Sequence, residues 1–336
     1  MRLVVYESRC QQCSTSLASF TGPPATIRVC RAVGRVAHDD HASARHPWAV
    51  LLSPRCRTTV PSSYRLPVSG GFLPPTRQRN PMDVFAVPGL PEVRPGDDLA
   101  AVIEERADLR DDDVLLVAST VVSKAEGRLA ALDDFPPSPR AKEIAGRLEE
   151  ISGEEKDPRF AQAVLEESTE IIVEAPFLLT ATRFGHVGVN AGIDRSNVGD
   201  GGADLLLLPE RPDESAARIR RNLAADPAVI VTDTCGRPFR HGQRGVAIGW
   251  AGIPASRDWR GETDRDGHEL EVTVESVVDE LAATANLVTG EGDDGLPVAV
   301  VRDWEFGDHD GSDNLFRDVE GDFVRQALRG WEFARD

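Results

Sequence analysis

The sequence predicts an α+β fold, with mixed sheets and flanking helices, for residues 82–336. Short apolar runs such as Val114–Ala118 are typical of buried strands. A capping serine followed by proline, as at Ser138-Pro139, is typical of a helix start, and Phe184–Gly188 indicates a hairpin. Residues 1–81 differ, because they show no sustained helical or strand period. We expect that segment to be disordered or not native to the protein.

Charge divides the chain at the same place. Residues 1–81 hold eleven Arg, three acidic residues and no Lys, which makes them +8 in a chain of −18, so residues 82–336 carry −26. Four of the five cysteines and nine prolines also lie in the basic segment. We therefore predict a boundary at Met82. The basic Cys/Pro/Arg-rich extension is interpreted as the product of a misplaced start codon, and residues 82–336 as one domain.

Composition also excludes several classes of function. The acidic, Lys-poor part repels nucleic acid and anionic membranes, and no apolar run approaches the ~20 residues of a membrane span. Cys10 and Cys13 form a CxxC pair that no second pair completes, which disfavours zinc. The acidic part contains one cysteine, Cys235, so no disulfide framework is expected. The composition fits a cytoplasmic protein in a halophilic, high-salt cytosol.

The remaining elements are expected from local patterns of apolar and capping residues. Strands are predicted at 84–87, 114–118, 171–173, 177–179, 205–208, 228–231, 245–249 and 298–301. Helices are predicted to run from Asp97 or Asp98 to 106, and over 138–151, 158–167, 213–224, 271–287 and 318–331. The helix at 271–287 should be the longest, with an apolar stripe that belongs to the core.

The segment Val231–Gln243, VTDTCGRPFRHGQ, is the first candidate for a functional site. A strand is expected to end at Thr232, followed by Asp233 with a hydroxyl on either side and by Arg237 and Arg240. Hard oxygens hold divalent cations, while guanidinium groups bind phosphate oxygens. An acidic residue at a strand end is just as often a turn former, so this loop alone leaves both interpretations open.

A second loop carries the same kind of side chains. Asp194 follows a predicted hairpin and is flanked by Asn190, Ser196 and Asn197, which add amide and hydroxyl oxygens. Two small-residue loops that each supply one carboxylate are a pair that can share one cation. The sequence therefore predicts a divalent metal site between them.

Two further stretches indicate a phosphate ligand. Ser119–Lys124 places hydroxyls and one of the few lysines after a strand, and Thr289–Gly295 is a glycine-rich acidic loop. A solvated surface charge and a solvated turn are the alternative interpretations. No Walker loop and no GxGxxG after a strand occurs in the chain, so any nucleotide site is of another type.

Taken together, these motifs resemble the coenzyme F420-0:L-glutamate ligase family. The linked set covers essentially all of residues 82–331 in family order, and consists of Gly89-Leu90-Pro91, Ser119-Thr120-Val121-Val122-Ser123-Lys124-Ala125-Glu126-Gly127-Arg128, Asn190-Ala191-Gly192-Ile193-Asp194-Arg195-Ser196-Asn197, Thr232-Asp233-Thr234-Cys235-Gly236-Arg237 and Gly290-Glu291-Gly292. The resemblance implies a family-specific ligase fold and a homodimer.

The resemblance also implies an activity and a set of site residues. The expected enzyme is a GTP-dependent ligase that adds L-glutamate to coenzyme F420-0, first by an α-linkage and then by a γ-linkage, through an acyl phosphate. The resemblance further implies that the enzyme uses K⁺ and two divalent ions, Mg²⁺ or Mn²⁺. Asp194 and Asp233 would hold one of these ions, and Thr234 and Glu291 would contact the other. Lys124, Asp194 and Asp233 are the implied catalytic residues. The implied GTP site consists of Gly89, Leu90, Pro91, Glu92, Ser119, Thr120, Lys124, Asn197, Thr289, Gly290, Glu291, Gly292, Asp293, Asp294, Gly295 and Leu296.

Two alternatives stay open on the sequence. One is a metal-dependent module that binds a nucleotide or phosphate without turnover. The other is a related amino-acid ligase that acts on another phosphorylated acid.

Overall fold

The computed structural model describes residues 81–198, 202–331 and 333, together with the strands at 6–9, 16–22 and 25–31. The chain divides into two compact units, residues 1–74 and 75–336. The first unit contains an antiparallel sheet in the order β1-β2-β3, with β1 at Tyr6–Arg9, β2 at Ser16–Gly22 and β3 at Ala25–Arg31. These strands were not predicted from the sequence, although Ile27 and Val29 alternate with Arg28 in the sequence of β3.

A five-stranded mixed sheet organises the second unit. Its spatial order is β12-β11-β5-β15-β4, and only β5 and β11 are parallel neighbours. The strands are β4 (Asp83–Ala86), β5 (Val114–Ala118), β11 (Ala228–Arg237), β12 (Arg240–Ala251) and β15 (Val298–Arg302). Strand β15, predicted from its apolar run, lies inside the sheet because β4 pairs with its outer edge.

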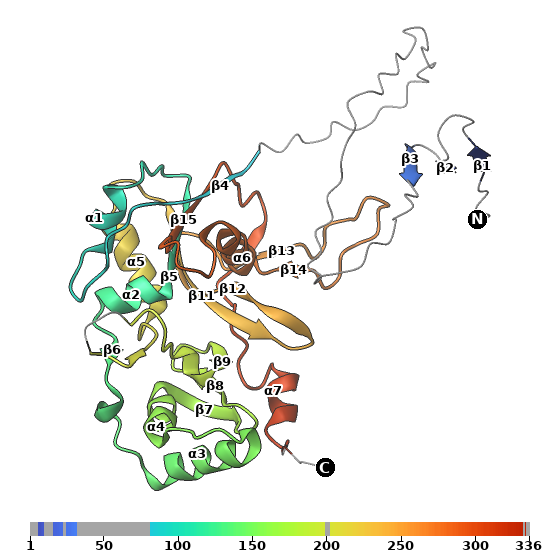
Figure 1. Cartoon of the computed structure of the whole chain (residues 1–336). Helices are drawn as coiled ribbons and strands as arrows, with labels where there is room; N and C mark the ends of the chain where they lie inside the picture. Colours follow the sequence, from blue (N-terminus) through green and yellow to red (C-terminus); the bar gives the residue numbers. More distant parts are fainter. Residues whose placement is uncertain are drawn as a thin grey trace, which may run out of the picture. The chain divides into compact units, whose positions relative to one another are not determined.

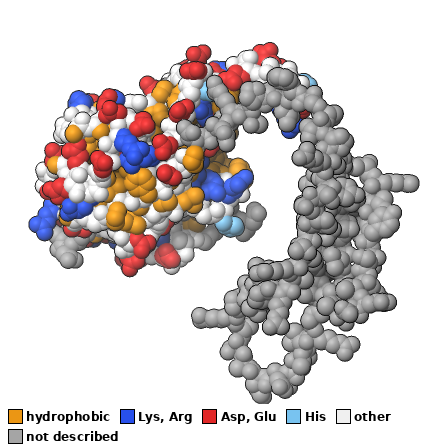
Figure 2. All heavy atoms as spheres, turned by 90° about the horizontal axis from the view of Figure 1, so that it is seen from above, with side chains coloured by type: hydrophobic (Ala, Val, Ile, Leu, Met, Phe, Trp, Pro, Cys, Tyr) orange, Lys and Arg blue, Asp and Glu red, His pale blue; other side chains and the backbone are white. Residues whose placement is uncertain are grey.

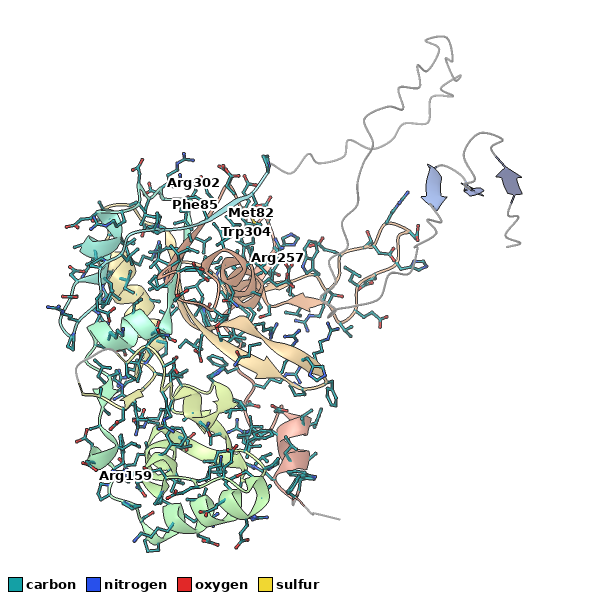
Figure 3. All side chains as sticks on the ribbon, viewed as in Figure 1. Met82, Phe85, Arg159, Arg257, Arg302 and Trp304 are labelled. Atoms are coloured by element: carbon teal, nitrogen blue, oxygen red, sulfur yellow. The ribbon has the colours of Figure 1, made fainter. Side chains whose placement is uncertain are left out.

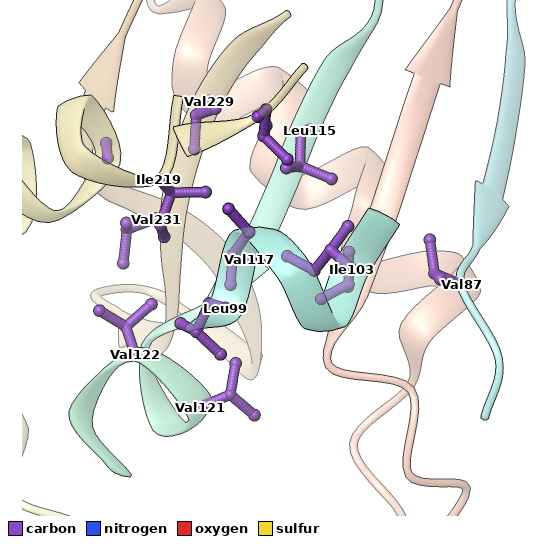
Figure 4. Close-up of a cluster of buried hydrophobic side chains, with 14 of the residues drawn as sticks. Val87, Leu99, Ile103, Leu115, Val117, Val121, Val122, Ile219, Val229 and Val231 are labelled. Atoms are coloured by element: carbon purple, nitrogen blue, oxygen red, sulfur yellow. The ribbon is translucent and has the colours of Figure 1, made fainter. Parts of the chain in front are cut away.

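Helices cover both faces of this sheet, as Figure 1 shows. Alternate strand residues point to opposite faces, so Leu115 and Val117 pack with one set of helices while Val114 and Leu116 pack with another. One face is covered by α1 (Leu99–Glu104), α2 (Ser119–Ala125) and α5 (Pro212–Asn222), and the other by α6 (Val277–Thr289). Figure 4 shows the first of these cores, where Ile103 lies close to Val117.

A smaller lobe is inserted between β5 and β11. It contains α3 (Pro139–Ser152), α4 (Pro158–Glu167) and the antiparallel sheet β7 (Ser168–Val173), β8 (Leu179–Thr182) and β9 (Val187–Val189). The predicted helix start is confirmed, because the Ser138 side chain accepts a hydrogen bond from the Ala141 amide at 3.2 Å. The predicted hairpin is confirmed by the pairing of β8 with β9.

The remaining elements are short. They are β6 (Leu129–Ala130), which pairs with β10 (Leu205–Leu206), the 3-10 turns Leu132–Asp134 and Asn190–Gly192, the sheet of β13 (Ser256–Asp258), β14 (Val274–Glu275) and β16 (Asp310–Ser312), and α7 (Phe323–Leu328). Arg257 of β13 is buried, binds both carboxylate oxygens of Glu275 and lies beside the Trp304 ring (Figure 3).

An ion pair joins two neighbouring strands of the sheet, β5 and β15, that are far apart in the sequence. Arg302, after the apolar run of β15, donates to both oxygens of buried Asp113 at 2.7 and 2.6 Å, and its guanidinium lies 5.4 Å from the Phe85 ring centroid (Figure 3). Asp113 directly precedes β5, so the pair holds the start of β5 against the end of β15. A fully desolvated carboxylate needs such a partner to stay charged.

Several predicted boundaries differ from the structure. The helix predicted over 271–287 begins at Val277, because the β-branched stretch before it forms β14. It has 13 residues and is shorter than α3, which has 14. Asp213 lies in the first turn of α5 and is not its cap, and the last helix covers only Phe323–Leu328.

The described surface is mixed in charge. Figure 2 shows Asp and Glu side chains spread over the face in view, between Lys, Arg and apolar side chains. Of the helices in the described ranges, none combines the length and apolar character needed to cross a membrane.

Candidate active site

The long hairpin of β11 and β12 creates the site. Strand β5 pairs with β11 only as far as Thr232, because the chain turns at Ser119 into α2. Beyond that point β11 continues with β12 alone as its partner, and Asp233 lies at the open edge. The prediction that a strand ends at Thr232 was therefore wrong: Asp233 is inside a strand. Its Oδ1 accepts a hydrogen bond from Ser119 Oγ at 3.3 Å.

Asp233 is electrostatically unusual. The pKa of this carboxyl is raised to about 6, chiefly by burial and also by the negative charges of Asp194 and Glu291, against hydrogen bonds from Thr234 and Ser119 that lower it. The three carboxylates therefore repel one another across one region. Such a group favours a cation nearby, because positive charge relieves both the desolvation and the repulsion.

Asp194 is held by a tight left-handed turn. Asn190, Ala191 and Gly192 have φ values of 55°, 55° and 68°, and the buried Ala191 amide donates to Thr180 Oγ1 at 2.9 Å. A Cβ on Gly192 would lie 2.4 Å from Leu208 Cδ1, so only glycine fits there. Strained backbone of this kind persists where the surroundings enforce it.

The Asp194 backbone and side chain are both fixed. Its amide and carbonyl each pair with Leu206, at 3.0 and 2.9 Å. Its carboxylate accepts from the Ser196 amide at 2.7 Å and from Ser196 Oγ at 2.8 Å. Asn197 Nδ2 in turn lies 3.4 Å from Ser196 Oγ. The loop therefore presents an oriented carboxylate, as the sequence suggested.

Lys124 is a buried cation. It lies in α2, is 8% exposed, and its Nζ lies 2.5 Å from Glu92 Oε1. The Glu92 side chain is 66% exposed, so an incoming anion can replace it without burying a carboxylate. The interpretation of Lys124 as a solvated surface charge was wrong.

The loop after α6 faces the hairpin. Glu291 Oε1 accepts hydrogen bonds from Thr234 Oγ1 at 3.0 Å and from Asn286 Nδ2 at 2.9 Å. Gly290, with φ of 70°, ends α6 and turns the chain toward β11. Thr234 and Glu291, separated by more than fifty residues in the sequence, are thus direct neighbours.

These groups meet around one cavity of about 960 Å³. The cavity is lined by thirteen of the sixteen residues implied for the GTP site and by all four implied for metal: Leu90, Pro91, Glu92, Ser119, Thr120, Lys124, Asn197, Thr289, Gly290, Glu291, Gly292, Gly295 and Leu296, with Asp194, Asp233 and Thr234. Gly89, Asp293 and Asp294 are not in the lining; Gly89 instead accepts a hydrogen bond from Arg106 Nε at 2.8 Å.

The two arginines expected beside Asp233 lie elsewhere. Arg237 and Arg240 pair with each other across the hairpin and are not among the lining residues, although Gly236 and Pro238 on either side of Arg237 are. Conversely, sequence reasoning missed His186, Asn286 and the whole of α7 as walls of the cavity. Only tertiary packing brings those residues there, so no local pattern marks them.

The oxygen atoms of Asp194, Asp233, Thr234 and Glu291 are of the chemical type that binds a hard divalent cation. Carboxylate and hydroxyl oxygens are the ligands that Mg²⁺ and Mn²⁺ take, and Mg²⁺ usually needs only one or two carboxylates besides water and substrate phosphates. Within residues 81–198 and 202–331, no three His, Cys, Asp or Glu side chains form a cluster that could hold a metal by themselves. The arrangement thus suits an ion that shares its coordination with a substrate.

Comparison with known proteins identifies the family. The sequence profile of the F420-0:Gamma-glutamyl ligase family matches residues 89–303. The Coenzyme F420:L-glutamate ligase of Halorubrum lacusprofundi is 77% identical over 252 residues, which is 75% of this chain and 99% of that protein. The proteins of the same name from Archaeoglobus fulgidus and Methanosarcina mazei are 50% and 43% identical, over 74% of this chain and 98% and 96% of their own lengths. The chain therefore belongs to the F420-0:gamma-glutamyl ligase family.

Proposed function

We propose that this protein is a GTP-dependent ligase that adds L-glutamate to coenzyme F420-0, first by an α-linkage and then by a γ-linkage, in coenzyme F420 biosynthesis. Family membership supports glutamate ligation. One observation carries the rest: Lys124, Asp194, Asp233 and the loop after α6 line the same cavity.

The chemistry requires activation of a carboxylate. A carboxylate is a poor electrophile, so its oxygen first attacks the γ-phosphorus of GTP, the bond to the bridging oxygen breaks, and GDP leaves with the electron pair. The amine of glutamate then attacks the acyl carbon of the resulting acyl phosphate and loses a proton, and inorganic phosphate leaves. Negative charge accumulates on the transferred phosphoryl group during the first step.

Lys124 is the residue best suited to that charge. Its ammonium is already desolvated and oriented toward the cavity by Glu92. A phosphate oxygen that displaces the exposed Glu92 carboxylate gains a charge-assisted hydrogen bond to Nζ. The backbone amide of Gly292 offers a further donor to phosphate oxygens, whereas that of Gly290 already donates to the Asn286 carbonyl at 3.0 Å.

Divalent metal is part of the proposal. Asp194 and Asp233 would hold one Mg²⁺ or Mn²⁺ ion, and Thr234 and Glu291 would touch a second; bound there, the ions would neutralise phosphate charge. Asp233, raised in pKa by burial and by neighbouring carboxylates, supports this assignment. We also propose that turnover depends on K⁺, which an assay without K⁺ tests. We further propose that the protein is a homodimer, which light scattering tests.

The experiment is an end-point assay of the full chain. It is incubated with GTP, L-glutamate, Mn²⁺ and coenzyme F420-0, and we expect GDP together with acceptor that carries one and then two glutamates by mass spectrometry. Omission of glutamate should remove the product. Nucleotide binding without GDP release would identify a binding module, and product formed only from a different phosphorylated acid would identify a related ligase; either result contradicts the proposal.

A further inference from the structure

The cavity has a second end whose chemistry differs from that of the carboxylate end. Ile172, Leu179 and Val187 of the β7–β9 sheet line it on one side, and Val324 and Leu328 of α7 line it on the other. Ile172 and Leu328 belong to one apolar cluster, and α7 packs on β7, as Figure 1 also shows. The match to the family profile ends at residue 303, so it does not include α7.

We propose that this end of the cavity binds the acceptor substrate, taking the flat heteroaromatic ring of coenzyme F420-0 between β9 and α7, with His186 as a polar contact. The inference rests on the proposed function and names the substrate subsite. A flat ring buries both its faces against apolar side chains, which the carboxylate end does not offer. The acceptor carboxylate then extends toward Lys124 and Asp233.

The lining of the cavity, which has a volume of about 960 Å³, is divided by chemistry. The groups suited to phosphate and metal lie on β11, α2 and the loop after α6, whereas Val324 and Leu328 lie on α7. The apolar wall is therefore left for the acceptor once the nucleotide occupies the polar one.

Charge supports an anionic acceptor at the same end. Arg325 lines the cavity and is 8% exposed, and it shares the single carboxylate of Glu170 with Arg329. The two guanidinium groups, Arg329 first, hold the pKa of Glu170 below its ordinary value. Asp322 also lines this end and balances the second arginine, so the positive charge offered to an anion is the Arg325 guanidinium itself and not a net surplus.

His186 supplies the independent evidence for a ligand. It lines the cavity, is 6% exposed, and its Nε2 is the only buried side-chain nitrogen or oxygen atom without a hydrogen-bond partner in the described ranges. Phe184 stacks near its ring at 6.4 Å and Phe316 meets it edge-on at 6.1 Å, so neither neighbour offers a partner. A buried polar atom without a hydrogen bond destabilises the free protein. Because Nε2 is closed to solvent in this structure, a bound ligand recovers that contact when the His186 ring turns toward the cavity.

The first test uses two adjacent residues of α7. Val324 is 68% exposed and lines the cavity, while Phe323 is 77% exposed and does not, so either can be changed without disturbing a core. Val324→Glu should raise the KM for coenzyme F420-0 about tenfold or more, with the KM for GTP within twofold of the parent. The matched control Phe323→Glu should leave both constants unchanged.

The second test is His186→Phe, which replaces the imidazole with a larger aromatic ring that has no nitrogen. We expect an equal or higher melting temperature together with an acceptor KM raised several-fold, a combination that a purely structural histidine does not produce. If Val324→Glu leaves the acceptor KM unchanged, or changes only the KM for GTP, the subsite is misassigned. A parent enzyme that forms no glutamylated product overturns the proposed function and this inference together.

Discussion

Gly192 is the position where one added methyl group should cause a large, calculable loss of stability. Its φ of 68° is left-handed, which costs an L-residue about 1–2 kcal/mol. A Cβ would also lie 2.4 Å from Leu208 Cδ1 and 2.9 Å from Leu208 Cγ, and Leu208 is itself buried. Overpacking of this kind costs about 1–3 kcal/mol. We expect Gly192→Ala to destabilise the second unit by roughly 3 kcal/mol, within a range of about 2–5 kcal/mol.

Differential scanning fluorimetry in high-salt buffer at a fixed scan rate measures this loss. For a unit of this size 1 kcal/mol corresponds to about 2–4 °C, so the melting temperature should fall by roughly 6–12 °C. Gly146→Ala is the matched control, because Gly146 is an exposed residue of α3 with no atom within 4 Å of the added Cβ. That change should stabilise the helix by up to about 1 kcal/mol. If the melting temperature of Gly192→Ala lies within about 2 °C of that of the parent, neither the left-handed φ nor the close contact with Leu208 destabilises the variant as predicted.

Four further predictions concern the site and the chain. Lys124→Met should lower kcat by ~10²–10³ and raise the KM for GTP, and Lys124→Arg should restore little of either; steady-state kinetics in which both constants stay within about twofold would remove the lysine from the phosphate site. Asp194→Asn and Asp233→Asn should each fold normally but require more Mn²⁺ for half-maximal turnover, and an unchanged metal titration in both would refute the assignment. Burial lowers the pKa of His186 to about 4 from 6.5, so its contribution to stability is present above pH 6.5 and lost as pH falls toward 4; melting curves of His186→Phe should show a weaker decline over that window, and curves parallel to the parent would contradict it. A chain that begins at Met82 should melt and turn over like the full chain, and a large loss of either would show that residues 1–81 contribute to the enzyme.

Local signals explain what could be predicted from the sequence. Both ends of the strand Val114–Ala118 were predicted correctly, because a short apolar run between polar residues is typical of a buried strand. The cap at Ser138 was predicted because capping depends on residues within one turn of the helix. Asp194 and Asp233 were also chosen from a local signal, because each is flanked in the sequence by small and hydroxyl residues.

Long-range pairing explains what could not be predicted. Asp233 lies within a strand only because β12 extends its pairing past the end of β5, a fact set by residues 240–246 and not by its own neighbours. The walls formed by His186 and α7 depend on packing between segments far apart in the chain. Arg325, for example, reaches Glu170, which lies 155 positions earlier.

The position of α7 has a consequence for synthesis of the protein. The other walls of the cavity come from residues 90–124, 172–208 and 232–299, whereas α7 supplies residues 322–328. Synthesis runs from the amino terminus, so this wall is the last part of the cavity lining to be made. The cavity is therefore not closed on that side until residues 322–328 have been synthesised and have packed against β7.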